Sequence, residues 1–221
     1  YRSSKTSMFT KTRVVITVPS GVTEVERRAV EDAARAAGAQ EVELIEEPMA
    51  AALGAGLPVF EAAGSMVVDI GGGTCDVAVM SLGGIAARKS VKIAGNALNE
   101  AIINHMKRAH NLLIGDVTAE DIKIKIGSVS EYDGEGAMEV RGRNLTDGLP
   151  NKIEITSEEI RNVLTEPVGE IVEAIRETLE VTLPELAADI IDRGIYITGG
   201  TALLRGLPEL ISKETKICLL Y

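Results

Sequence analysis

The chain has 221 residues, of which 45% are hydrophobic and 3% aromatic, and its formal net charge at pH 7 is −10. This length suits one large domain or two smaller lobes with a substantial core. The acidic balance argues against sequence-independent binding of nucleic acid, which requires a basic face, and the scarcity of aromatic residues argues against stacking on single strands.

Strands and helices are predicted to alternate over the first 60 residues. Residues 13–18 form an apolar run typical of a buried strand, and Thr23 with Glu26 has the spacing of a capping box at a helix start. A short strand over residues 41–45 and an alanine-rich helix from Pro48 follow. This order implies parallel pairing, with helices on the sheet faces.

The middle of the chain predicts a meander, two helices and a small sheet. Strands are expected at 66–69, 75–80 and 85–93, joined by glycine turns, and a helix opens at Thr118. Residues 134–155 alternate as in an antiparallel sheet. Between these segments, four apolar residues predict one face of a helix: Leu98, Ile102, Met106 and Ala109.

The last third predicts a long amphipathic helix and a second glycine turn. Thr156 and Glu159 have N-terminal capping spacing, and Pro167 is expected to kink or split the helix that they begin. Residues 217–221 have the pattern of a strand cut short. We therefore expect the chain to be a fragment of a longer protein.

Two short glycine turns, about 130 residues apart, are the most informative feature of the chain. Residues 69–74 read Asp-Ile-Gly-Gly-Gly-Thr between two apolar runs, and residues 198–201 read Thr-Gly-Gly-Thr after a strand. A strand that ends in glycines brings backbone N–H groups up to a phosphate because no Cβ intervenes. The two turns together, with an acid on the first, predict a nucleotide held between them.

The first turn offers candidate phosphate and magnesium ligands. Beside Gly71, Gly72 and Gly73, the carboxylate of Asp69 is placed to hold Mg²⁺ through water next to phosphate oxygens; the alternative is that it caps its own turn. The Thr74 hydroxyl is placed to face a γ-phosphate or an attacking water; the alternative is an ordinary β-branched start of a strand.

Two acids before Pro48 are candidates for catalysis. A carboxylate at a helix N-terminus that faces a phosphate can orient a water for in-line attack, and Glu46 and Glu47 both have this position. The alternative is that these acids only stabilise the helix, because negative side chains are favourable at the positive end of its dipole.

Further candidates concern the nucleoside. Glu120 and Lys123 are three residues apart, hence on one helix face, where they either contact a ribose or adenine or form a solvated ion pair. The second turn lets an adenine ring approach bare backbone, or is only a tight connection; its residues are Gly199, Gly200 and Thr201. We interpret His105, His110 and Cys75 as non-catalytic, because none has an evident partner motif.

In this order the motifs are similar to those of the superfamily of actin, heat-shock-chaperone and sugar-kinase ATPases, and within it the chain most closely resembles the MreB family of bacterial actins. The resemblance runs over nearly the whole chain. It is carried by residues 18–21, 25–29, 44–52, 67–74, 141–145, 183–186 and 203–207.

The resemblance implies an α/β, actin-like (ribonuclease H-like) ATPase fold with two lobes around a nucleotide cleft. Residues 1–62 would be a remnant of an incomplete first lobe. Residues 63–221 would form the second lobe, with its core at 63–97 and 157–221 and a small inserted subdomain at 98–156.

The resemblance also implies the roles of the candidate residues toward ATP and Mg²⁺. Glu47 would position the hydrolytic water, with Thr74 assisting and Glu46 as the second choice. Asp69 and the turn at 71–74 would bind phosphate and, through water, Mg²⁺. The nucleoside would contact Glu120 and Lys123, and the adenine would lie on Gly199, Gly200 and Thr201.

At the level of function, the resemblance implies a cell-shape-determining ATPase that forms filaments of its own copies. These filaments would lie on the cytoplasmic face of the inner membrane, with Met8 and Phe9 touching lipid. They would organise peptidoglycan synthesis with elongation proteins such as RodZ, MreC and MreD.

The chain departs from the family pattern at several places. Thr201 stands where close relatives have a third glycine, and Asn99 and Lys125 stand where relatives commonly have acids. The first phosphate hairpin of the family is not part of the chain, so we expect this chain to hydrolyse ATP poorly or not at all, and a full-length parent to do so slowly. The alternatives are a heat-shock-type chaperone ATPase and a sugar-kinase-like enzyme.

Overall fold

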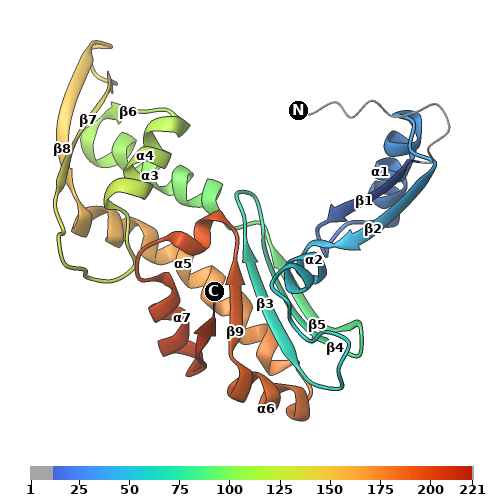
Figure 1. Cartoon of the computed structure of the whole chain (residues 1–221). Helices are drawn as coiled ribbons and strands as arrows, with labels where there is room; N and C mark the ends of the chain where they lie inside the picture. The colour runs from blue at the N-terminus through green and yellow to red at the C-terminus, as the bar shows by residue number, and fades with distance from the viewer. Residues whose placement is uncertain (1–11, 221) are drawn as a thin grey trace.

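The strands form three separate sheets in the computed structural model, which describes residues 12–220 (Figure 1). A five-stranded sheet lies centrally, with a two-stranded sheet on one side and a three-stranded sheet toward the other end of the molecule. Helices pack between and against them (Figure 1). The predicted α/β class is confirmed.

The central sheet has the strand order β10-β9-β3-β4-β5. Strands β3, β4 and β5 are the predicted antiparallel meander, whereas β9 pairs parallel with β3, and β10 parallel with β9. Because β3 and β9 are parallel, both end at the same edge, where ligands of α/β sheets bind. The bounds are β3 (Ser65–Ile70), β4 (Cys75–Ser81), β5 (Gly84–Val91), β9 (Ile195–Thr198) and β10 (Leu219–Leu220).

Alternate residues of β3 enter two different hydrophobic cores. Met66 and Val68 belong to the main core, which α5 (Ser157–Glu180) covers, whereas Val67 packs with Ala52 of α2 (Glu47–Gly54) on the other face. Burial on both faces explains why β3 and β4 are nearly continuous apolar runs in the sequence, whereas β5, at the edge of the sheet, carries polar residues.

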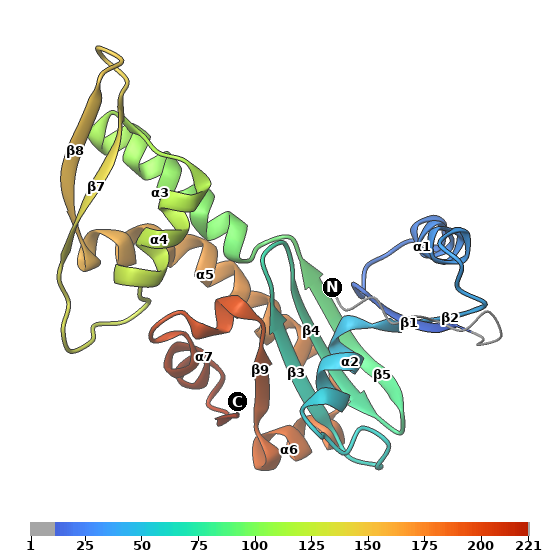
Figure 2. The same cartoon turned by 45° about the horizontal axis from the view of Figure 1, so that its top comes forward.

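The N-terminal part is a parallel β–α–β unit (Figure 2). Strands β1 (Arg13–Val18) and β2 (Glu41–Glu46) pair in parallel, as predicted, and α1 (Glu24–Ala36) connects them. The capping box is present: the Thr23 side chain accepts the Glu26 N–H, and the Glu26 carboxylate accepts the Thr23 N–H. Figure 2 shows that α2 joins this unit to the central sheet.

The three-stranded sheet packs with two helices. Strand β7 is antiparallel to β6 and to β8. Of the four residues predicted to share one helix face, Leu98, Ile102 and Met106 are buried. The fourth, Ala109, is exposed, because it lies in the last turn of α3, past the part that the core covers. The elements are α3 (Gly95–His110), β6 (Leu112–Leu113), α4 (Asp116–Ile126), β7 (Ala137–Asn144) and β8 (Pro150–Thr156).

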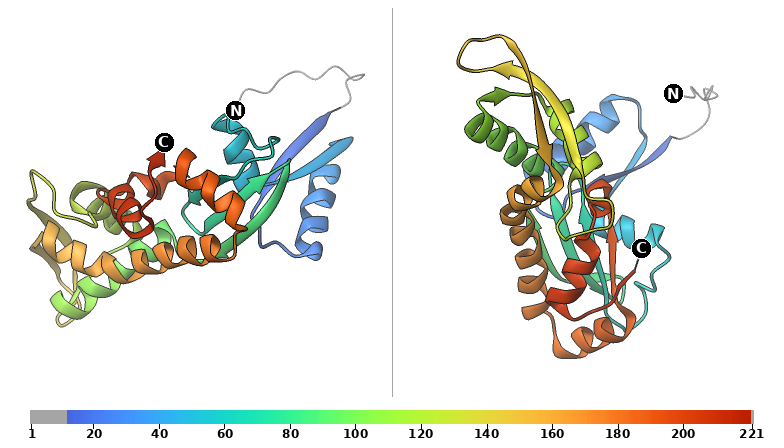
Figure 3. Two further views of the ribbon diagram at one scale, coloured as in Figure 1. Left: turned by 90° about the horizontal axis from the view of Figure 1, so that it is seen from below. Right: turned by 90° about the vertical axis from the view of Figure 1, so that its left-hand side faces the viewer.

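Helix α5 extends from the β7–β8 hairpin along the central sheet (Figure 3). It is one continuous element of 24 residues with Pro167 inside. Of the two expected effects of Pro167, a kink or a split, the split is therefore wrong. Proline removes one backbone hydrogen bond. Buried residues on both sides of it, including Leu164 and Val168, hold the two halves in the same core.

The C-terminal part surrounds β9. Helix α6 (Pro184–Arg193), which the sequence analysis did not anticipate, precedes β9. The short 3₁₀ helix η1 (Gly200–Leu203) and α7 (Leu207–Thr215) follow it. None of the helices formed by residues 12–220 combines the length and apolar character needed to cross a bilayer.

Candidate functional site

The two glycine turns lie side by side at one edge of the central sheet. In the parallel register of β3 and β9, Asp69 is opposite Thr198, so both turns leave adjacent strands at the same end. The Thr201 hydroxyl donates a hydrogen bond of 2.8 Å to the carbonyl of Gly71. The convergence of the two turns that the sequence predicts is therefore confirmed.

The first turn keeps backbone N–H groups free at its tip. The Gly71 N–H closes the turn on the Thr74 carbonyl at 3.0 Å, and the first N–H groups of α3 bond to the carbonyls of Gly71 and Gly72. Among residues 12–220, no backbone hydrogen bond of this turn uses the N–H of Gly72 or Gly73, and both glycines are exposed. Such free N–H groups in a tight turn are suited to an anion.

The second turn requires glycine at position 199. Gly199 has a φ of +90°, and a Cβ there would lie 2.3 Å from the carbonyl oxygen of Ile70 and 2.7 Å from Oδ1 of Asp69. Gly200 is exposed and has no heavy atom near its Cβ position. Gly199 therefore brings the strands together, whereas Gly200 leaves open space.

A cavity of about 500 Å³ opens between these turns and α4. This volume lies within the range of small-molecule sites. Of the predicted nucleoside and adenine residues, Glu120, Lys123, Gly200 and Thr201 line it. The remaining lining residues are Gly71, Gly72, Gly95, Asn96, Ile124, Gly127, Leu203, Leu204 and Arg205.

Lys123 is the buried cation of this cavity, only 7% exposed. Its Nζ donates to the Gly95 carbonyl at 3.1 Å and to Oε2 of Glu120 at 2.8 Å. Asn99 donates its side-chain amide to the same Glu120 oxygen at 2.8 Å. The hydrogen bond from Lys123, aided by that from Asn99, lowers the pKa of Glu120 although burial opposes the shift. The burial of Lys123 excludes a fully solvated ion pair.

Three carboxylates gather near the first turn, away from the cavity lining. Burial and then the charge of Asp76 raise the pKa of Asp69. Burial and then the charges of Asp76 and Asp69 raise the pKa of Glu47. Within residues 12–220, no lysine or arginine forms an ion pair with any of the three.

Asp76 is the member of this group that the sequence analysis missed. It is 1% exposed and lies directly opposite Asp69 across the β3–β4 hairpin. Its Oδ1 accepts the backbone N–H of Ser20 at 3.4 Å. An acid within the apolar strand 75–80 was the available signal, because a buried charge requires a partner.

The structure separates the two candidate acids before Pro48. Glu46 forms a salt bridge of 2.8 Å with Arg88 on β5. Glu47 is the first residue of α2, and among residues 12–220 its carboxylate forms neither a hydrogen bond nor an ion pair, unlike that of Glu46. Glu47 is therefore the acid left free to act on a ligand.

Thr74 and Cys75 follow the first turn into β4. Thr74 is half-buried and does not line the cavity. Burial, followed by the charges of Asp76 and Asp69, raises the pKa of the Cys75 thiol to about 12. This thiol is not ionised at neutral pH, in agreement with its interpretation as non-catalytic.

The residues present fit an adenine nucleotide with a divalent cation. Free N–H groups at Gly72 and Gly73 suit phosphate oxygens, and the cavity beside them has the size and mixed polarity of a nucleoside site. Oxygen ligands without a cationic partner, here Asp69 and its neighbours, are the donor set that Mg²⁺ prefers. The lipid-contact prediction concerns Met8 and Phe9, which lie outside the described residues.

Known proteins match this chain over nearly its whole length. The family described as "MreB/Mbl protein" matches residues 1–221. The chain is 54% identical over 214 residues to the cell shape-determining protein MreB of Escherichia coli strain K12. That match covers 97% of this chain and 62% of the relative, so the chain spans less than two thirds of the relative's length.

Solved structures show the fold. MreB5 of Spiroplasma citri bound to AMPPNP superposes with a TM-score of 0.94 at 40% identity, over 99% of this chain and 66% of that one. A MamK double helical filament gives a TM-score of 0.78 at 21% identity, over 94% of this chain and 63% of that one, which is a likeness of fold alone. The predicted actin-like fold is confirmed, and the chain belongs to the MreB/Mbl family.

Proposed function

We propose that this chain carries the nucleotide site of a cell-shape-determining bacterial actin that binds and hydrolyses ATP. The observation that carries the proposal is the convergence of both glycine turns and the Glu120–Lys123 pair on one cavity. Two comparisons support it: the similar MreB5 structure is bound to AMPPNP, and the similar Escherichia coli protein is described as cell shape-determining.

In this proposal, the residues divide between the two ends of ATP. Adenine lies on the second turn, Gly199, Gly200 and Thr201, and the nucleoside contacts Glu120 and Lys123. The turn at 71–74 donates N–H groups to the phosphates.

The carboxylates act at the phosphate end of the site. Asp69 holds Mg²⁺ through water, and bound Mg²⁺ supplies neutralisation of phosphate charge. Glu47, at the N-terminus of α2, orients the attacking water, and Thr74 assists it. Glu46 is bound to Arg88 and serves structure instead.

Assembly and location are the second part of the proposal. ATP binding favours head-to-tail filaments of this protein, and a protein of the same fold, MamK, forms a double helical filament. The filaments lie on the cytoplasmic face of the inner membrane and organise peptidoglycan synthesis with RodZ, MreC and MreD. Contact through Met8 and Phe9 contributes at most about 1.5–3 kcal/mol for each side chain, so firm attachment requires the multivalency of a filament.

A matched pair of acid variants tests the catalytic assignment. Glu47→Gln should abolish ATP turnover in the full-length protein that the resemblance predicts, while fluorescent-ATP binding to the 221-residue chain is retained. Glu46→Gln, one residue away, should keep turnover and lower only stability, by about 0.2–1 kcal/mol. Full turnover by Glu47→Gln would refute the role of Glu47.

Nucleotide binding itself is tested before hydrolysis. The 221-residue chain should bind fluorescent ATP in the presence of Mg²⁺, and Lys123→Met should weaken that binding. Absence of saturable binding by the chain and by the full-length protein would remove the basis of the proposal. The comparison of their turnover rates tests the expectation that this chain alone hydrolyses ATP poorly.

Sedimentation of the full-length protein with ATP and anionic lipid vesicles separates the functional classes. Filaments that bind vesicles support the proposal. Release of an unfolded peptide on ATP addition, or phosphorylation of a polyol, would support the chaperone or the sugar-kinase alternative. The match to the MreB/Mbl family over residues 1–221 favours the first outcome.

A further inference from the structure

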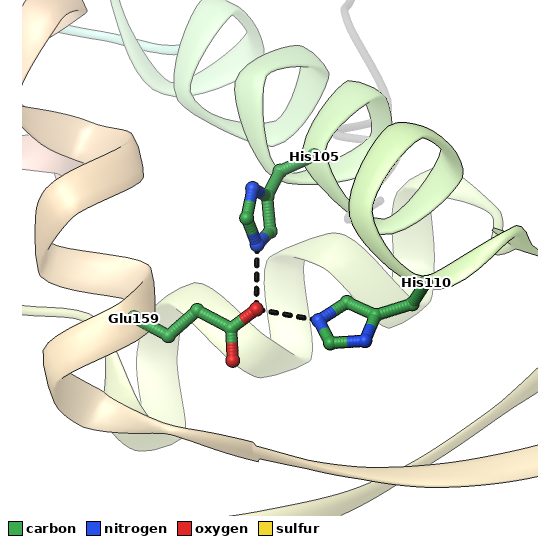
Figure 4. A group of neighbouring side chains, drawn as sticks. All are labelled: His105, His110 and Glu159. Carbon is green, nitrogen blue, oxygen red and sulfur yellow. Dashed lines mark hydrogen bonds and ion pairs between the residues drawn. The ribbon is translucent and has the colours of Figure 1, made fainter.

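Both histidines of the chain meet one carboxylate in the part of the molecule that holds the three-stranded sheet (Figure 4). Nε2 of His105 lies 2.6 Å from Oε1 of Glu159, and Nε2 of His110 lies 2.5 Å from the same oxygen. One ligand atom of each residue lies within 4.8 Å of the other two. None of the three lines the nucleotide cavity.

The contact of both histidines with Glu159 depends on the packing of α3 against α5, and not on the spacing of the histidines along α3. Residues five apart are separated by roughly 140° around an α-helix, so His105 and His110 do not share a face of α3 by spacing alone. Figure 4 shows the Glu159 side chain reaching from α5 toward both rings. The ring centroids are 5.7 Å apart, with an interplanar angle of 76°.

The Glu159 carboxylate binds the two imidazoles and does not cap the N-terminus of its own helix. At the start of α5, the Thr156 hydroxyl accepts the Glu159 N–H at 3.2 Å, as in a capping box. The Glu26 carboxylate returns to its own N-cap at α1, whereas the Glu159 carboxylate bonds to the two imidazoles instead. Although burial opposes it, these hydrogen bonds and the imidazole charges lower the pKa of Glu159.

We propose that His105, His110 and Glu159 form a binding site for Zn²⁺ or a similar borderline transition-metal ion. Two imidazoles and one carboxylate are a known zinc ligand set, with a fourth position left for water. The three side chains are 26–27% exposed, so an ion can enter while most of each ligand stays packed.

The distances from the two imidazole nitrogens to the carboxylate oxygen require only a small adjustment to bind a metal ion. In a tetrahedral site with bonds of about 2.0–2.1 Å, ligand atoms are roughly 3.3 Å apart. The Nε2–Oε1 distances of 2.6 and 2.5 Å would each open by less than about 1 Å. Each Nε2 must give up its proton to bind the metal, so protons are released or move to Nδ1.

A bound ion would fasten the end of α3 to the first turn of α5. His110 is the last residue of α3, and Glu159 is the third residue of α5, directly after β8. Metal binding should therefore raise the thermal stability of this part of the molecule. Mg²⁺ should not replace Zn²⁺, because it prefers oxygen ligands, so this site is independent of the proposed nucleotide function.

Zinc titration of the untagged 221-residue chain tests the proposal. The Cys218→Ser background removes the exposed thiol, which is itself a soft metal ligand. Calorimetry should show one saturable Zn²⁺ site that excess Mg²⁺ does not abolish. Because the chain has two histidines, the NMR signals of both imidazoles should shift in step with occupancy. Co²⁺ should give the absorption bands of a tetrahedral site.

Variants identify the ligands. His105→Gln, His110→Gln and Glu159→Gln should each weaken Zn²⁺ binding by more than about 100-fold, the upper end of the effect of an outer-shell partner. Glu158→Gln removes an equal charge from the adjacent, exposed position and should leave affinity unchanged.

The unsubstituted histidines decide the case even if a ligand variant fails to fold. Absence of saturable Zn²⁺ binding in the Cys218→Ser chain, or binding that leaves both imidazole signals unmoved, would overturn the proposal. Equal affinity of a folded His105→Gln variant would do the same.

Discussion

The hydroxyl of Thr201 joins two turns that are 130 residues apart in sequence, by a hydrogen bond of 2.8 Å to the carbonyl of Gly71. The same carbonyl accepts the N–H of Gly95 at 3.1 Å. The start of η1, the β3–β4 hairpin and the start of α3 therefore meet at one oxygen atom. The Thr201 side chain therefore holds both walls of the candidate nucleotide site together.

Removal of this hydroxyl should loosen the site. Thr201→Val keeps the volume of a buried side chain but cannot donate to Gly71, so we expect a loss of about 0.5–1.5 kcal/mol in the free energy of unfolding and weaker ATP binding. Urea unfolding and a fluorescent-ATP titration measure the two effects. Thr201→Ser retains the donor and serves as the control. Unchanged stability and affinity in Thr201→Val would show that the hydrogen bond is dispensable.

Adjacent glycines of the second turn should respond differently to alanine. At Gly199, φ is +90° and a Cβ would lie 2.3 Å from a backbone oxygen, so Gly199→Ala should destabilise the fold by at least about 1–3 kcal/mol. Gly200 has open space at its Cβ position, so Gly200→Ala should stay within about 0.5 kcal/mol of the parent.

The ATP affinities of these two variants show whether each glycine is needed for folding or for binding. We expect Gly200→Ala to weaken ATP binding in spite of its normal stability, because the new methyl group enters the cavity. Urea midpoints and binding isotherms for both variants provide the measurement. Equal stability losses at the two positions would contradict the assignment of separate roles.

Two lysines of α4 form a matched pair for a charge test. Lys123 is buried with Glu120 at 2.8 Å, whereas Lys125 forms an exposed pair with Asp121 at 3.0 Å. Lys123→Met leaves the Glu120 carboxylate and the Gly95 carbonyl without their donor, and should cost about 1–3 kcal/mol and most of the ATP affinity. Lys125→Met should change stability by less than about 0.5 kcal/mol. A similar loss in both would show that the burial of Lys123 has no energetic consequence.

The carboxylates near the first turn predict a pH dependence. Asp69 and Glu47 have pKa values in the folded state above the ordinary 3.8 and 4.5. The protonated forms therefore favour folding: this contribution is complete below the ordinary values and is lost as the pH rises through the raised ones. Above the raised pKa values both groups are charged, and their burial and like-charge repulsion then oppose folding.

Asp69→Asn should consequently be more stable than the parent at pH 7, and the difference should shrink toward pH 4. It should also bind ATP with Mg²⁺ more weakly, as expected for a functional acid that costs stability. Urea unfolding at pH 4, 5.5 and 7 measures the difference, with the exposed Asp192→Asn as control. A constant difference across this range would argue against a raised pKa of Asp69.

Some parts of the site were predictable because their signal is short-range. Each glycine turn directly follows an apolar run that predicts a strand. Because β3 and β9 pair in parallel, the two turns then lie at the same edge of the sheet. Glu47 and Glu46 were both recognisable as acids at a helix start. Their separation was not, because it depends on Arg88, 42 residues away along the chain.

Other parts escaped because burial and partner choice are properties of the assembled fold. Asp76 is an acid in an apolar strand, and only its position opposite Asp69 shows that the two charges interact. The contact of His105 and His110 with Glu159 could not be predicted from local sequence, because Glu159 lies 54 and 49 residues away along the chain. Pro167 was expected to kink or split its helix, and tertiary packing keeps that helix in one piece.

The amino-acid sequence by itself determined the class of the fold, the elements with a clear period or cap, and the glycine-rich edge where a nucleotide is expected. These features depend on interactions within a few residues, such as the reciprocal bonds of Thr23 and Glu26. Only the tertiary structure decided that Lys123 is buried, that Thr201 bridges both turns and that Glu159 faces two imidazoles. Such outcomes depend on which distant groups share a space from which water is excluded, and spacing along the chain does not encode that directly.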